Sequence, residues 1–126
     1  FMIMGNGKPL RQFLHAEDLS SVLLSVVLDP ITREKFIDQY LVNVAPNDEH
    51  SIAFVGQLIM QHMKTIMGSD KPIDINFSDK SEGNCQLRKT ASVDRLSSIY
   101  PMESLIPIST GIRKVCEYYV QKTTKV

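Results

Sequence analysis

Residues 5–19, GNGKPLRQFLHAEDL, lead from a turn through an extended segment into the start of a helix. Gly5 and Gly7 lie on either side of Asn6, and an Asn-Gly pair favours a tight turn because both residue types tolerate positive φ. A dinucleotide-binding fingerprint would need a third glycine followed directly by a helix, whereas Leu10 occupies that place here. The stretch therefore predicts a turn that joins two strands.

Strand and helix signals alternate along the rest of the chain. Short apolar runs predict strands at residues 1–4, 10–15, 40–44 and 73–77. Apolar residues spaced three and four apart predict helices at 16–29, 52–67, 93–100 and from Ser109 or Thr110 onward. Residues 31–39 are predicted as a short helix or a loop, and 78–89 as a polar loop. This alternation indicates a small mixed α/β domain with short strands and about four helices.

Local signals predict the ends and the buried faces of these helices. Ser51 and Ser92 are N-cap candidates, Pro30 marks the end of the first helix, and Gly68 fits the C-terminal end of the second. The predicted faces are Leu19, Val22, Leu23, Val26 and Val27 in the first helix, Ile52, Val55, Ile59, Met63 and Ile66 in the second, and Ile112, Val115, Cys116 and Tyr119 in the last.

Charge and composition limit the possible partners. Lys+Arg and Asp+Glu both number 14 in 126 residues, so no net charge favours binding to nucleic acid or to an anionic membrane. No apolar run reaches the roughly 18 residues that a membrane-spanning helix needs. Cys85, Cys116 and the three histidines have no metal-type spacing, so we expect no metal site and two free thiols in a reducing compartment.

The start of the chain resembles the middle of a longer protein. It does not begin with Met, and its apolar run lacks the basic flank and cleavage site of a signal peptide. We therefore expect a fragment in which residues 1–122 form one domain and residues 123–126 form a tail.

Arg11 is the residue most suited to bind an anion. It follows the turn closely and has the apolar neighbours Leu10, Phe13 and Leu14. A guanidinium in that setting needs an anionic partner, which could be the carboxylate of Asp18 or a phosphate that the guanidinium binds through two hydrogen bonds. Lys89 lies beside Arg88 in the second polar segment, where the two could also be an ordinary solvated pair of charges.

Two further sets of polar residues are interpreted as structural. Tyr118 and Lys122 have the Tyr-x-x-x-Lys spacing that short-chain dehydrogenases use for proton transfer, but no cofactor-binding fold precedes them. We interpret the pair as the end of an amphipathic helix. His62 lies near the apolar face of its helix and is interpreted as a core or boundary residue.

Three segments together resemble a known family. GNGKPLRQFLHAEDLSSVLL (5–24) is similar to the start of the substrate domain in extended short-chain dehydrogenases/reductases. YLVNVAPNDEHSIAFVGQLI (40–59) resembles the Asn-Val-Gly and Ser-Ile segment of the same family. QLRKTASVDRL (86–96), followed by a helix that contains CEYYV, is similar to the GDP-L-fucose synthases within it. The resemblance covers nearly the whole chain and implies the C-terminal substrate-binding domain of such an enzyme.

The resemblance also implies an activity and its partners. GDP-L-fucose synthases epimerise C3 and C5 of GDP-4-keto-6-deoxy-D-mannose and then reduce C4 with NADPH. In the family, an N-terminal Rossmann domain binds NADP(H) and carries the catalytic residues, so this chain alone is expected to bind no cofactor and to be inactive. A homodimer in the cytoplasm is implied for the full-length enzyme. Another nucleotide-sugar epimerase or dehydratase, or a non-catalytic α/β interaction module, remains an alternative.

Four residues are carried over from the family by position. Arg11 and Lys89 match an arginine and a lysine that lie at the diphosphate of the nucleotide. Met4 stands where the family usually has Trp, and its sulfur could still pack against the ligand. Asn84 stands where the family often has Asp and could still bond a ribose hydroxyl, although Glu82 could be the true equivalent.

Overall fold

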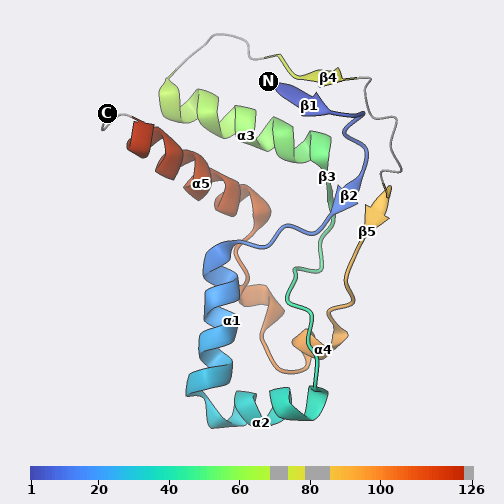
Figure 1. The fold of residues 1–126 in the computed structure, drawn as a ribbon. Coiled ribbons are helices and arrows are strands. Elements are labelled where there is room, and N and C mark those ends of the chain that lie inside the picture. The colour runs from blue at the N-terminus through green and yellow to red at the C-terminus, as the bar shows by residue number, and fades with distance from the viewer. Residues whose placement is uncertain (69–73, 79–85, 124–126) are drawn as a thin grey trace. The chain divides into compact units, whose positions relative to one another are not determined.

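The computed structural model describes residues 1–68, 74–78 and 86–123, which form two compact units (Figure 1). The first, called here the sheet unit, comprises the described residues of Phe1–Arg11, His50–Lys89 and Pro107–Val126. The second, called the helical unit, comprises Gln12–Glu49 and Thr90–Ile106. Short strands and helices alternate as the sequence predicts, so the expected small mixed α/β fold is confirmed.

The sheet unit contains two small sheets. In one, β1 (Met2–Met4) pairs in parallel with β4 (Asn76–Ser78). In the other, β2 (Leu10–Arg11) lies between two partners, antiparallel to β3 (His50–Ser51) and parallel to β5 (Arg88–Lys89). The central position of β2 makes the turn before it the element that sets the position of this sheet.

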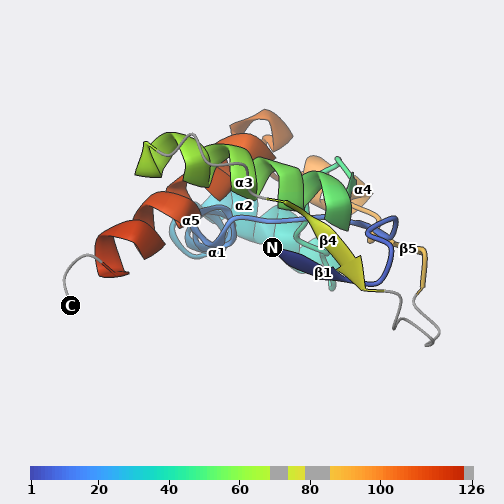
Figure 2. The same ribbon diagram turned by 90° about the horizontal axis from the view of Figure 1, so that it is seen from above.

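Two long helices complete the sheet unit. Helix α3 (Ile52–Met67) begins after Ser51, whose hydroxyl accepts the backbone N–H of Phe54, and ends at Gly68 with a φ of 59°, as predicted for both ends. Helix α5 (Ile108–Thr123) packs along α3, as Figure 2 shows from above. Gly56 lets α3 approach β1 closely, because a Cβ there would lie 2.7 Å from Cδ1 of Ile3.

The helical unit is built from shorter pieces around an apolar core. Its elements are α1 (Ala16–Leu28), α2 (Pro30–Gln39), α4 (Asp94–Ser97) and a 3₁₀ turn at Met102–Ser104. Val22, Ala45, Val93 and Leu96 form the buried cluster, with Leu96 fully buried. Pro30 follows the end of α1 as predicted, and it also begins α2, because a proline at the first helical position loses no hydrogen bond.

Three predictions about the helical unit are wrong. Residues 40–44 pair with no strand among the described residues; at the start of this segment, Arg95 donates to the carbonyls of Gln39 and Leu41. Ser92 is not the N-cap, since Val93 takes that place without a side-chain bond. The apolar face of α1 is narrower than its periodicity indicates, because only Val22 of the five predicted residues is buried.

Strand boundaries in the sheet unit also differ from the prediction. The extended segment predicted at 10–15 forms a strand only at Leu10–Arg11. The strand predicted at 73–77 is found at Asn76–Ser78, and residue 73 lies outside the described residues. Arg88–Lys89 form a strand inside the predicted polar loop, because the backbone of β2 offers them hydrogen-bonding partners that no local pattern reveals.

Candidate functional site

The register of the three-stranded sheet brings three nitrogen-bearing side chains into one row. Arg11 on the central strand lies opposite Lys89 of β5 and opposite His50 of β3. Residues directly opposite one another on neighbouring strands project from the same face of a sheet. We call His50, Arg11 and Lys89 the basic row. It joins residues that are up to 78 positions apart in the sequence.

The glycine turn holds the central strand in place. Gly7 has a φ of 68°, and a Cβ there would lie 2.6 Å from Cε1 of Phe77 and 2.9 Å from Cβ of Ala53. Its carbonyl accepts the backbone N–H of Ala53 at 2.9 Å, and the carbonyl of Pro9 accepts that of Ile52 at 3.1 Å. These bonds use N–H groups of the first turn of α3, which lack partners within the helix. Residues 7–9 are therefore bonded to the first turn of α3, and the strand that contains Arg11 begins directly after them.

The guanidinium of Arg11 is oriented by two neutral oxygens. It donates to the carbonyl of Leu10 at 2.6 Å and to the carbonyl of Gln86 at 3.0 Å. In the described part of the chain, these two bonds use two of the roughly five N–H donors of an arginine, which leaves the others for a further acceptor. Among the described residues, no carboxylate forms an ion pair with Arg11. Arg11 is half-buried, and its two bonds to carbonyl oxygens orient the guanidinium without any described carboxylate paired with it.

Asp18, the carboxylate that the sequence offers as an alternative partner for Arg11, has a structural role in the helical unit. It is buried, and both of its oxygens accept the backbone N–H of Ile106 at 3.1 Å. These bonds satisfy a buried charge and tie the first turn of α1 to the segment that follows the 3₁₀ turn. The burial of Asp18 is thus explained by a backbone donor.

His50 is the member of the row that sequence reasoning missed. Its imidazole stacks on the ring of Phe54, with ring centroids 5.0 Å apart and planes inclined by 19°. From the sequence, we considered His50 only as a possible metal ligand, and its spacing from the other histidines and cysteines does not fit a metal site. The pairing of His50 with Arg11 follows from the antiparallel register of β2 and β3, for which the sequence offers no local signal.

The other predicted binding residues are not brought into the row. Met4 lies on β1, in the separate two-stranded sheet, where it is 74% exposed and its sulfur accepts the hydroxyl of Ser78 at 3.6 Å. Asn84 and its alternative Glu82 lie outside the described residues. The structure therefore brings Arg11 and Lys89 together and places Met4 in another sheet.

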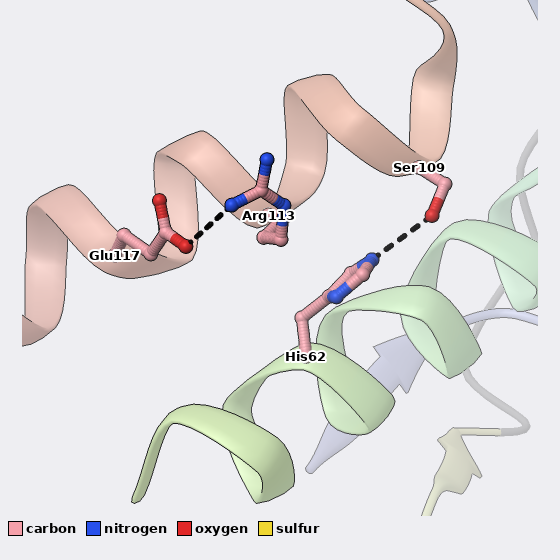
Figure 3. A network of polar contacts seen from close by, with 4 residues as sticks. All are labelled: His62, Ser109, Arg113 and Glu117. Atoms are coloured by element: carbon pink, nitrogen blue, oxygen red, sulfur yellow. Dashed lines mark hydrogen bonds and ion pairs between the residues drawn. The ribbon is translucent and has the colours of Figure 1, made fainter.

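Figure 3 shows one polar contact between α3 and α5 and one ion pair within α5. His62 lies 3.1 Å from the hydroxyl of Ser109, and Arg113 forms an ion pair of 2.8 Å with Glu117 one turn along α5. His62 is half-buried, in keeping with its interpretation as a boundary residue. The nitrogen of Lys122 lies 5.8 Å from the centre of the Tyr118 ring, so these two residues make a cation–π contact at the exposed end of α5.

Other types of site find no support in the part of the chain that the structure describes. No group of three or more His, Cys, Asp or Glu side chains lies close enough to hold a metal ion in residues 1–68, 74–78 and 86–123. Burial raises the pKa of the Cys116 thiol, which keeps it in the less reactive protonated form. Within the same residues, no helix has both the length and the apolar character needed to cross a membrane.

Comparison with known proteins gives one consistent result. No family model matches the chain. The chain is 32% identical over 118 residues to a GDP-L-fucose synthase of Dictyostelium discoideum. The alignment covers 94% of this chain and 33% of that protein. It is 24% identical over 124 residues to a probable GDP-L-fucose synthase of Drosophila melanogaster, covering 96% of this chain and 34% of that protein.

A solved structure agrees with these relatives in fold. A GDP-L-fucose synthetase from Naegleria fowleri, crystallised with NADP bound, matches 98% of this chain with a TM-score of 0.74 and 22% identity, over 35% of its own length. The chain thus spans about a third of the length of the proteins that it matches. In sequence and in fold, this chain resembles GDP-L-fucose synthases over nearly its whole length.

Proposed function

We propose that this chain is the substrate-binding segment of a GDP-L-fucose synthase and that Arg11 and Lys89 bind the diphosphate of its GDP-sugar. The observation that carries the proposal is the pairing of these two residues on neighbouring parallel strands. Neighbouring strands lie about 4.8 Å apart. Two cationic side chains on neighbouring strands repel each other, and an anion bound between them would reduce that repulsion.

The chemistry of the two side chains fits a diphosphate. A guanidinium can bind phosphate oxygens through two parallel N–H···O bonds, and an ammonium adds a compact positive charge beside it. The two carbonyls that hold the Arg11 side chain support this role, because they reduce the conformational freedom that the side chain would lose on binding. A hydrogen bond to a charged group contributes about 1.5–3 kcal/mol.

In the proposed reaction, this chain binds the part of the substrate that does not react. The full-length enzyme would epimerise C3 and C5 of GDP-4-keto-6-deoxy-D-mannose and reduce C4. NADPH, bound by a separate N-terminal domain, would supply the hydride. Arg11 and Lys89 would hold the GDP half, and the binding energy from that half would position the ketosugar for chemistry elsewhere.

The remaining expectations about the full-length protein belong to the same proposal. Met4 is proposed to line the substrate site through its exposed side chain, and Asn84 to bond the ribose. The full-length enzyme is proposed to be a cytoplasmic homodimer. This chain alone is proposed to be inactive, because the cofactor and the catalytic residues would belong to the N-terminal domain.

Replacing Arg11 tests the proposal in the protein that the complete open reading frame encodes. Arg11→Ala should raise KM for the ketosugar nucleotide, and Kd for GDP, about tenfold or more. Arg88→Ala is the matched control, because it removes the same charge from the neighbouring residue of β5, which projects from the opposite face. An unchanged KM in Arg11→Ala would overturn the assignment of the diphosphate to the basic row.

Nucleotide specificity is tested on the same protein. A ligand that binds only the native state raises its Tm, so GDP, UDP, dTDP and CDP can be ranked by thermal shift. The proposal expects the largest shift with GDP. A larger shift with UDP, dTDP or CDP would instead support another nucleotide-sugar epimerase or dehydratase.

A further inference from the structure

We infer that His50 forms a third contact to the anion that Arg11 and Lys89 bind, an inference that rests on the function proposed above. His50 lies opposite Arg11 on the other neighbour of the central strand, so Arg11 has Lys89 on one side and His50 on the other. The three side chains project from one face of the sheet. A diphosphate held by the central arginine would therefore lie within reach of the imidazole.

The position of the imidazole is fixed by the start of α3. His50 directly precedes the N-cap residue Ser51, and Phe54 is the residue whose backbone N–H the Ser51 hydroxyl accepts at 3.1 Å. The two rings that stack are thus attached to the same capping structure. The stack, with centroids 5.0 Å apart and planes inclined by only 19°, limits the rotation of the imidazole before any ligand binds.

The ring nitrogens of His50 are suited to bind an oxygen. Phe54 covers one face of the imidazole, whereas both nitrogens lie in the ring plane, at the edge that stacking does not cover. Among the described residues, neither nitrogen has a hydrogen-bond partner, in contrast to His62, which is bonded to Ser109. An imidazole donates one hydrogen bond when neutral and two when protonated, so it can donate to a phosphate oxygen in either form.

The experiment compares histidine and arginine variants of the protein encoded by the complete open reading frame, by calorimetric titration with GDP and by steady-state kinetics. His50→Ala should weaken GDP binding about tenfold or more, as expected for the loss of one hydrogen bond to a charged phosphate. KM for the nucleotide sugar should rise while kcat stays unchanged, because the contact is made equally in the ground and transition states. His62→Ala removes the same ring from α3 and should leave both values unchanged.

Two more variants separate binding from folding. His50→Gln keeps a hydrogen-bond donor and should retain part of the affinity that His50→Ala loses. Phe54→Leu keeps an apolar side chain but removes the flat ring, and should weaken GDP binding less than His50→Ala does. The Tm of each unliganded variant shows whether the fold is intact. If His50→Ala lowers the Tm, the GDP affinity of His50→Gln is compared with that of the wild type instead.

The results distinguish this inference from the proposed function. Weaker GDP binding in Arg11→Ala and in His50→Ala supports both. Weaker binding in Arg11→Ala with unchanged binding in His50→Ala and His50→Gln overturns the role of His50 and leaves the proposed function standing. Unchanged binding in Arg11→Ala overturns the proposed function, and the inference about His50 with it.

Discussion

Different interactions stabilise the interior of the sheet unit and the interior of the helical unit. The helical unit depends on apolar burial, with Leu96 at 0% and Val22 at 2% exposure in its core. In the sheet unit, two glycines allow close approach: a Cβ at Gly7 would lie 2.9 Å from Cβ of Ala53, and one at Gly56 would lie 2.7 Å from Cδ1 of Ile3. We therefore expect the basic row to be sensitive to the backbone geometry of the glycine turn, and the helical unit to be sensitive to the volume of its core side chains.

The largest effect is expected from Leu96→Ala. The side chain is fully buried among Val22, Ala45 and Val93, so its loss should leave a cavity and lower the free energy of unfolding by about 2–5 kcal/mol. Leu41→Ala is the control in the same unit, because Leu41 is 69% exposed and should change stability by less than about 0.5 kcal/mol. Urea unfolding measures both, and equal effects would contradict a core centred on Leu96.

Compared with Leu96→Ala, Gly7→Ala is expected to have a smaller effect on stability and a larger effect on GDP binding. A Cβ at Gly7 would meet Phe77 and Ala53 at a φ of 68°, so we expect a loss of about 2 kcal/mol or more and weaker GDP binding. Gly68→Ala is the matched control, since Gly68 has a φ of 59° but, among the described residues beyond its own helix and chain neighbours, no atom within 4 Å of the added carbon. It should cost only about 1 kcal/mol and leave binding unchanged. Intact binding in Gly7→Ala would show that the turn does not position Arg11.

The smallest effect is expected at Asp29, which caps α2 in the helical unit. Its carboxylate accepts the N–H groups of Ile31 at 3.2 Å and Thr32 at 3.1 Å, and the hydroxyl and backbone bonds from Thr32 lower its pKa below the usual 3.8. A depressed pKa stabilises the fold at pH values above the ordinary pKa. That contribution is lost as the pH falls through the lower value of the folded state.

Replacing Asp29 with asparagine isolates this contribution. Asp29→Asn keeps a good capping side chain but cannot titrate, so its Tm should fall less steeply than that of the wild type below about pH 4. Asp29→Ala removes the cap and should lower the Tm by a few degrees at neutral pH. Parallel Tm curves for the wild type and Asp29→Asn between neutral and acid pH would contradict the role of the charge.

Local signals in the sequence predicted the helices better than the strands. Ser51 and Gly68 mark the two ends of α3 because a hydroxyl cap and a left-handed C-terminal residue act within a few positions of the chain. The short strands depend on partners far away in the sequence. Residues 40–44 have the composition of a strand but pair with no strand in the part of the chain that the structure describes, whereas Arg88–Lys89 have a polar composition and do pair.

The sequence by itself determined the glycine turn and the two ends of α3, and it singled out Arg11 as the candidate for binding an anion. Each of these depends on conformational preference or charge at a few neighbouring positions. Only the tertiary structure decided that Arg11 lies between Lys89 and His50, that Asp18 is bonded to Ile106, and that Met4 lies in another sheet. The physical reason is that strand register joins distant residues through backbone hydrogen bonds, which every residue type except proline can donate and accept.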